Sequence, residues 1–131
     1  MSELDVLKER VLERVIITNN PAVVEGFQMD SCHIKGDVRK VFTTVRDAVH
    51  KGARILTHPL SGSVKPNESP YKSIVITVAT GKLDLKSLSI IEDAIAMLDR
   101  LPDKNREYDE SVLEDFRIID LNFIRVANMS F

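Results

Sequence analysis

The chain has 131 residues, of which 44% are hydrophobic and 29% charged, and its formal net charge is −2. This composition is typical of a folded globular protein and excludes a largely disordered chain. The small net charge gives no electrostatic reason to expect nucleic acid or an anionic membrane as a partner. The length fits one domain, which we assign to residues 1–131.

Targeting and metal-binding signals are absent from the sequence. No apolar run approaches the roughly 20 residues that span a bilayer, and the first residues lack the pattern of a signal peptide, so we expect a cytoplasmic protein. The single cysteine, Cys32, cannot form an intramolecular disulfide, and we interpret it as a small strand residue. The three histidines are isolated, so we expect no metal site and no other cofactor.

The first half of the chain alternates helical and extended patterns. Apolar residues at helical spacing predict a helix over about residues 2–12, and the β-branched run at residues 15–17 predicts a buried strand. Asn20-Pro21 then predicts a helix start, because Asn caps free N–H groups and Pro suits the first helical position. A helix over residues 21–27 and a second strand over residues 28–34 follow.

The clearest helix covers residues 38–49, with Asp37 as its N-cap and Gly52 as its stop. Residues 54–57 and 73–79 predict a third and a fourth strand. A further helix, capped by Asp84 or Ser87, ends near Leu101. The last segment, residues 109–127, favours a helix with a wide apolar face, although residues 119–123 also alternate as a strand would.

Alternating strands and helices predict an α/β fold in three layers, with helices on both faces of a sheet. We expect a mostly parallel sheet of about four strands in the order 2-1-3-4. Open α/β sheets bind ligands at the carboxyl ends of the strands, where the winding reverses. Here that point would bring the turn at residues 18–21 together with the long segment at residues 57–72.

The segment at residues 57–72 is too long for an ordinary connection, and such connections are often functional. Three prolines would stiffen it, and its serines, threonine and lysines supply hydrogen-bond donors. The helix that starts at Pro21 adds N–H groups suited to an anion. We therefore expect a small anionic or amino-acid-like ligand, held by Thr18, Asn19, Asn20, His58, Ser61, Gly62, Ser63, Lys65, Asn67, Tyr71 and Lys72.

Several of these residues have structural alternatives. His58 precedes a proline, so its imidazole either caps the strand end or faces a ligand, and in an enzyme it would be the general acid or base. Asn19 either shapes the turn or contacts the ligand. The run from Ser61 to Lys65 is not the Walker sequence, and neither serine lies in a Gly-x-Ser-x-Gly elbow, so no catalytic residue is assigned.

Three segments of the chain are similar to a known family: Ile16-Ile17-Thr18-Asn19-Asn20-Pro21, Val45-Arg46-Asp47-Ala48-Val49-His50-Lys51-Gly52 and residues 56–74. Through them the chain resembles the GrdX family over about residues 15–79, most specifically in the long loop. The resemblance implies a cytoplasmic accessory protein, since the family consists of small proteins encoded with the glycine reductase components of anaerobic, amino-acid-fermenting bacteria. It implies glycine reductase components as possible partners, and it carries over no catalytic residue.

Three kinds of function follow. The protein binds a small ligand between the 18–21 and 58–72 loops, or docks on a reductase subunit as an assembly or regulatory protein, or is an enzyme that uses His58 as its general acid or base. The wide apolar face of the last helix fits the second alternative, and it also fits a homodimer.

Overall fold

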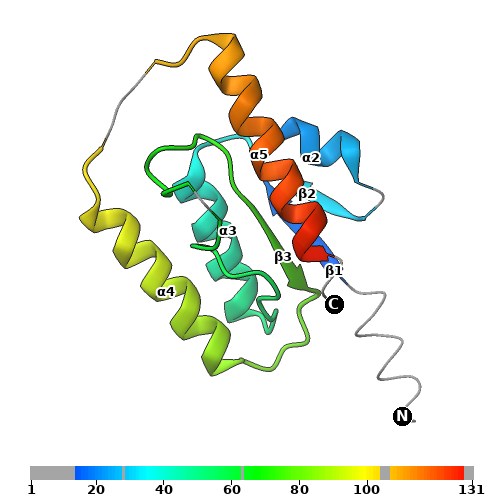
Figure 1. The fold of residues 1–131 in the computed structure, drawn as a ribbon. Coiled ribbons are helices and arrows are strands. Elements are labelled where there is room, and N and C mark those ends of the chain that lie inside the picture. Colours follow the sequence, from blue (N-terminus) through cyan, green and yellow to red (C-terminus); the bar gives the residue numbers. More distant parts are fainter. Residues whose placement is uncertain (1–13, 28, 63, 104–106, 129–131) are drawn as a thin grey trace.

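The computed structural model describes residues 14–27, 29–62, 64–103 and 107–128. In chain order these residues form β1 (Arg14–Thr18), α2 (Pro21–Gly26), β2 (Ser31–His33), α3 (Val38–His50), β3 (Ser73–Thr77), α4 (Leu85–Arg100) and α5 (Glu110–Asn128). Figure 1 shows the sheet between two pairs of helices. The expected helix over residues 2–12 lies outside the described residues.

The sheet has three strands in the order β2-β1-β3, so β1 is the central strand. β1 and β2 run parallel, and Ile16 lies opposite Ser31. β1 and β3 run antiparallel, and Ile16 also lies opposite Val75. The sheet is therefore mixed, with one parallel and one antiparallel pairing.

The predicted four-stranded, mostly parallel sheet with the order 2-1-3-4 is wrong, although the fold is α/β. Residues 54–57 form only an isolated antiparallel bridge, from Ile55 to Ile76 at the outer edge of β3. The loop at residues 57–72 reverses the chain, so β3 returns antiparallel and takes the place next to β1. Four of the five β3 residues are buried, whereas Arg54 is exposed. The more apolar segment therefore fills the position that needs burial on both faces.

Successive residues of β1 and β3 point into two separate apolar cores, as strand geometry requires. Ile17 and Ile74 pack with α3 and α4 on one face of the sheet. Ile16 and Val75 pack on the other face with α2 and α5. Figure 1 shows these pairs of helices on opposite sides, which agrees with the predicted layers.

The predicted helix ends rest on local hydrogen bonds. The backbone N–H of Lys40 donates to Oδ1 of Asp37, and that of Ser87 donates to Oδ2 of Asp84, so both aspartates are N-caps. After α3, Gly52 adopts a φ of +105°, a region that suits glycine, and a Cβ there would lie 2.5 Å from the backbone N of Gly81. The turns that follow α3 and β3 are therefore packed against each other.

The last segment is helical over Glu110–Asn128, so the strand alternative at residues 119–123 is wrong. A strand would expose half of its apolar residues, whereas the helix buries Ile124 completely against Val23 and Val75. None of the helices within the described ranges has both the length and the apolar character needed to cross a membrane.

Candidate functional site

The side chains of the turn after β1 are buried and hydrogen-bonded to other parts of the protein, so the start of α2 is not open to a ligand. Asn20 is fully buried, and its Oδ1 accepts from the backbone N of Ala22, which caps α2 as predicted. Its Nδ2 donates to the carbonyl oxygen of Arg117 at 2.9 Å and to Oδ2 of Asp120 at 3.0 Å. The start of α2 is therefore covered by α5, whose Asp120 places a carboxyl group there.

Asn19 connects the long loop to the sheet. Its Nδ2 donates to the carbonyl oxygens of Gly36 at 3.0 Å and Pro70 at 2.8 Å, and its Oδ1 accepts from the backbone N of Lys72 at 2.8 Å. The side chain is 7% exposed. Because these three contacts are with backbone groups, the amide of Asn19 fixes the position of the loop end.

A chain of hydroxyl groups runs from β1 through β3 to α5. The hydroxyl oxygens of Thr18 and Ser73 are 2.6 Å apart, and the Ser73 hydroxyl donates to Oδ2 of Asp120, also at 2.6 Å. All three side chains are buried. Since the Ser73 proton is used on Asp120, the Thr18 hydroxyl is the donor to Ser73. This chain joins the central strand to the last helix.

A small pocket of about 120 Å³ lies between the long loop and α5. Two opposite charges face it, Lys72 from the end of the loop and Asp120 from the helix, and aromatic rings from Phe116 and Phe123 form part of its wall. The other lining residues are Val38, Ser61, Gly62, Val64, Lys65, Pro66, Ser69, Tyr71 and Ile119.

The structure brings only some of the predicted ligand residues together. Five of them line the pocket: Ser61, Gly62, Lys65, Tyr71 and Lys72. Thr18, Asn19 and Asn20 are buried in the hydrogen-bond network around the end of β1. Asn67 lines a different hollow, described below. Ser63 lies outside the described residues.

Burial moves both charged groups of the pocket toward their neutral forms. Burial lowers the pKa of Lys72 below its usual value, and the carboxyl of Asp120 opposes that shift. Burial raises the pKa of Asp120, while hydrogen bonds from Ser73 and Asn20 and the charge of Lys72 act in the opposite direction. The Lys72 ammonium donates to the carbonyl oxygen of Ser61 at 2.6 Å and lies 5.4 Å from the ring centre of Phe123.

Tyr71 fastens the loop to the outer side of α5. Its hydroxyl accepts from Nη1 of Arg117 at 2.9 Å, and the guanidinium lies 5.7 Å from the centre of the Tyr71 ring. Arg117 also forms ion pairs with Glu110 and Glu114. The ion pairs hold the guanidinium in place against the phenol ring, so one wall of the pocket is fixed from both sides.

His58 is exposed and lies at the beginning of the loop. Its Nδ1 accepts from the backbone N of Leu60 at 3.1 Å, and its carbonyl oxygen accepts from the backbone N of Ser61, also at 3.1 Å. These bonds correspond to the structural alternative for His58, in which it caps the strand end by hydrogen bonding. The imidazole does not line the small pocket.

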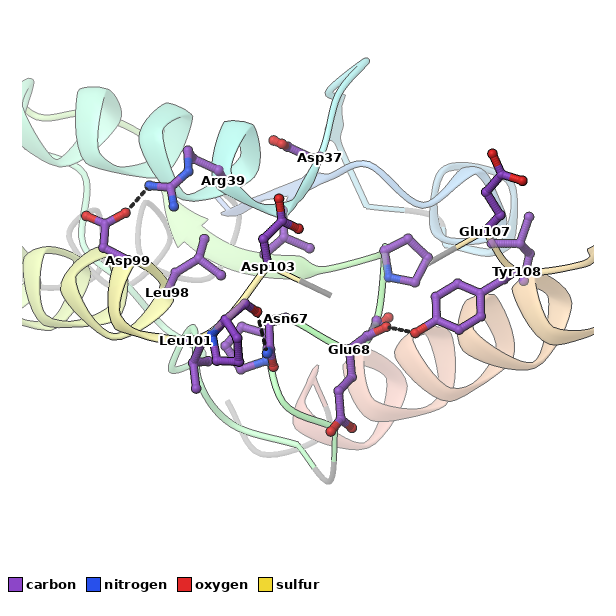
Figure 2. A pocket seen from close by; sticks show the side chains of 16 residues that line it. Asp37, Arg39, Asn67, Glu68, Leu98, Asp99, Leu101, Asp103, Glu107 and Tyr108 are labelled. Carbon is purple, nitrogen blue, oxygen red and sulfur yellow. Dashed lines mark hydrogen bonds and ion pairs between the residues drawn. The ribbon is translucent and has the colours of Figure 1, made fainter. Parts of the chain in front are cut away.

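A larger groove of about 820 Å³ lies beside the ends of α3 and α4 (Figure 2). Asn67 donates from Nδ2 to the carbonyl oxygen of Pro102 at 3.0 Å, and the Tyr108 hydroxyl donates to the carbonyl oxygen of Glu68 at 2.8 Å. The carboxylates that line it belong to Asp37, Glu68, Asp99, Asp103 and Glu107. Of the predicted ligand residues it contains only Asn67, so the smaller pocket is the candidate site.

Asp120 and Ser73 are polar residues of the site that were not predicted from the sequence. Asp120 lies within the apolar stripe of α5, four residues after Phe116 and four before Ile124, which is fully buried. A carboxyl group at such a position must find partners when the helix packs. That placement was the signal that could have identified Asp120. Among the described residues, no group of three or more His, Cys, Asp or Glu side chains is arranged to hold a metal ion.

The fold and the site define a small α/β protein in which the last helix and a proline-rich loop close a charged pocket beside a mixed sheet. The chain belongs to the GrdX-like protein family, whose model matches residues 15–128. No curated protein and no solved structure matches the chain.

Proposed function

We propose that this protein is an accessory binding protein that holds a small anionic or amino-acid-like ligand in the pocket between the long loop and α5. One observation carries the proposal: Lys72 and Asp120, far apart in the sequence, line the same small pocket, Lys72 from the end of the long loop and Asp120 from α5. Both groups are desolvated there, and within the described residues neither forms an ion pair, which leaves two buried charges without an opposite charge in direct contact. A bound polar molecule would offset that cost.

The size of the pocket limits the class of ligand. Pockets that bind drug-sized molecules measure roughly 300–1,000 Å³, whereas this one measures about 120 Å³. The ligand therefore has only a few heavy atoms. Phosphate, short carboxylic acids and the smallest amino acids meet this limit, and nucleotide cofactors do not.

Family membership supports an accessory role in the glycine reductase system, because GrdX proteins are encoded with the components of that enzyme. The ligand would then be a small metabolite that the protein senses or delivers to a reductase component. The localisation that fits this role is the cytoplasm.

A thermal-shift screen of phosphate, acetyl phosphate, glycine and related short acids tests the proposal. A ligand at 100 times its dissociation constant should add about 2.7 kcal/mol to the free energy of unfolding. Lys72→Met should abolish the shift and Lys65→Ala should reduce it. Lys82→Met is the control, because Lys82 is exposed and does not line the pocket. A screen in which no compound raises the midpoint would remove the proposal.

A second candidate, docking on a glycine reductase subunit, is favoured by the apolar residues that α5 exposes. Ile118 and Ile119 are each 44% exposed, and Val126 is 68% exposed. Co-purification from a native extract tests this function, with Ile118→Asp and Val126→Asp as variants that should lose the partner. Recovery of the protein without any reductase component would count against it.

A further inference from the structure

We infer that the pocket selects a zwitterion, with the ammonium group of the ligand on Asp120 and its carboxylate on Lys72. The ligand class is therefore a small amino acid. This inference rests on the proposed function, since it names the ligand of the same pocket. It begins from an arrangement of charges: within the described residues, neither Lys72 nor Asp120 forms an ion pair, although they line the same pocket.

Both charged groups retain hydrogen-bonding capacity for a ligand. An ammonium group has three N–H donors, and within the described residues the Lys72 ammonium uses one of them, on the carbonyl oxygen of Ser61. A carboxylate accepts at about four positions, and Asp120 receives two hydrogen bonds, from Ser73 and Asn20. Each group therefore has positions left to bind a ligand of opposite charge.

A ligand with a single charge satisfies only half of this site. An anion bound to Lys72 would lie in the same small pocket as the Asp120 carboxyl, and like charges in a desolvated site repel strongly. A cation on Asp120 would meet Lys72 in the same way. A zwitterion supplies an opposite charge to each wall, so the two interactions reinforce each other.

The surroundings of the two charges agree with this assignment. Asp120 is 8% exposed and fixed by hydrogen bonds from β3 and from the turn before α2. Lys65, the other charged side chain that lines the pocket, is exposed. Apart from the exposed Lys65, the pocket therefore contains one positive and one negative group. Its volume of about 120 Å³ and its aromatic rings leave space for a very small side chain at most.

Isothermal titration calorimetry of the full-length protein tests the inference with four probes. Glycine carries both charges, whereas acetate, methylammonium and glycinamide each lack one of them. We expect glycine to bind, and each singly charged probe to bind at least tenfold more weakly. The comparison uses the wild-type protein alone, so it does not depend on the folding of any variant.

Two substitutions then assign the charges to their walls. Asp120→Asn should weaken glycine binding at least tenfold and leave acetate binding unchanged or stronger. Lys72→Met should also weaken glycine binding at least tenfold, but it should leave methylammonium binding unchanged or stronger. Asp115→Asn and Lys82→Met are matched controls at exposed positions outside the pocket, and both should bind glycine as the wild type does.

The outcomes separate this inference from the proposed function. If acetate or phosphate binds as tightly as glycine, the pocket is an anion site, so the proposed function stands and the zwitterion inference is overturned. If neither these probes nor the compounds of the thermal-shift screen bind, both fall. If the two variants lose all probes equally, the assignment of one charge to each wall is wrong.

Discussion

Replacing Asn20 with alanine should destabilise the protein far more than the loss of a helix cap alone. The cap on Ala22 is worth about 1 kcal/mol. The two other hydrogen bonds, to the carbonyl oxygen of Arg117 and to Oδ2 of Asp120, are buried or partly buried, and each contributes about 1 kcal/mol or more. The expected loss is therefore about 3–4 kcal/mol, which lowers the melting midpoint by about 11–15 °C for a chain of this size.

Urea denaturation at neutral pH measures this loss, with Asn122→Ala as the control. Asn122 is exposed on α5, so its substitution should change the free energy of unfolding by less than about 0.5 kcal/mol. Asn20→Asp keeps the cap oxygen but sets a second carboxyl against Asp120, so at pH 7 it should cost more than Asn20→Ala and recover part of the loss on acidification. A loss of about 1 kcal/mol or less for Asn20→Ala would mean that only the cap is lost and that the hydrogen bonds to α5 contribute nothing to stability.

Three further predictions concern the pocket and the turn after α3. Burial lowers the pKa of Lys72, so the contribution of Lys72 to stability is present above its unfolded pKa of 10.5 and is lost as pH falls through the folded pKa. Lys72→Met should therefore unfold at no lower urea concentration than the wild type at pH 7. A clear loss of stability would contradict this. Burial raises the pKa of Asp120, so the contribution of Asp120 to stability is present below the unfolded pKa of 3.8 and is lost as pH rises through the folded pKa. Asp120→Asn should give a flatter curve of unfolding free energy against pH in this range. An unchanged curve would assign the pH dependence to other groups. Gly52→Ala should cost about 3 kcal/mol or more, since it adds a clash with backbone to the strain of a positive φ; Gly81→Ala, which has a positive φ but nothing within 4 Å of the added Cβ, should cost only about 1 kcal/mol, and equal losses in thermal melts would exclude the clash.

The helix starts were predictable from sequence because their chemistry is local. Asn20, Asp37 and Asp84 each cap the backbone of the next few residues, and such short-range bonds depend little on the rest of the fold. Helix α5 was also favoured correctly, since no Gly or Pro interrupts it. These features hold wherever the helices finally pack.

The sheet order was not predictable in the same way, because two apolar runs compete for the place beside β1. The chain reverses or crosses over before residues 54–57 and again before β3, so either segment could lie next to β1. The decision depends on burial of both faces, which β3 satisfies with Ile74, Val75 and Ile76. Local strand propensity does not show which of the two segments lies next to β1.

The residues of the candidate site show the same contrast between local features and long-range packing. Lys72 and the loop serines belong to a segment whose length and composition indicated a binding role. Asp120 acquires its role only when α5 packs against the turn at Asn20, 100 residues away. Its position in an apolar stripe was visible in the sequence, but its partners were not.

That separation has a consequence for the order in which the protein is made. Asn20 leaves the ribosome well before Arg117 and Asp120, which lie 97 and 100 residues further along the chain. Contacts between residues so distant in the chain form late and slow the folding reaction. The hydrogen bonds between the turn after β1 and α5 therefore form only after α5 has been synthesised. A nascent or truncated chain that ends before residue 120 has no pocket.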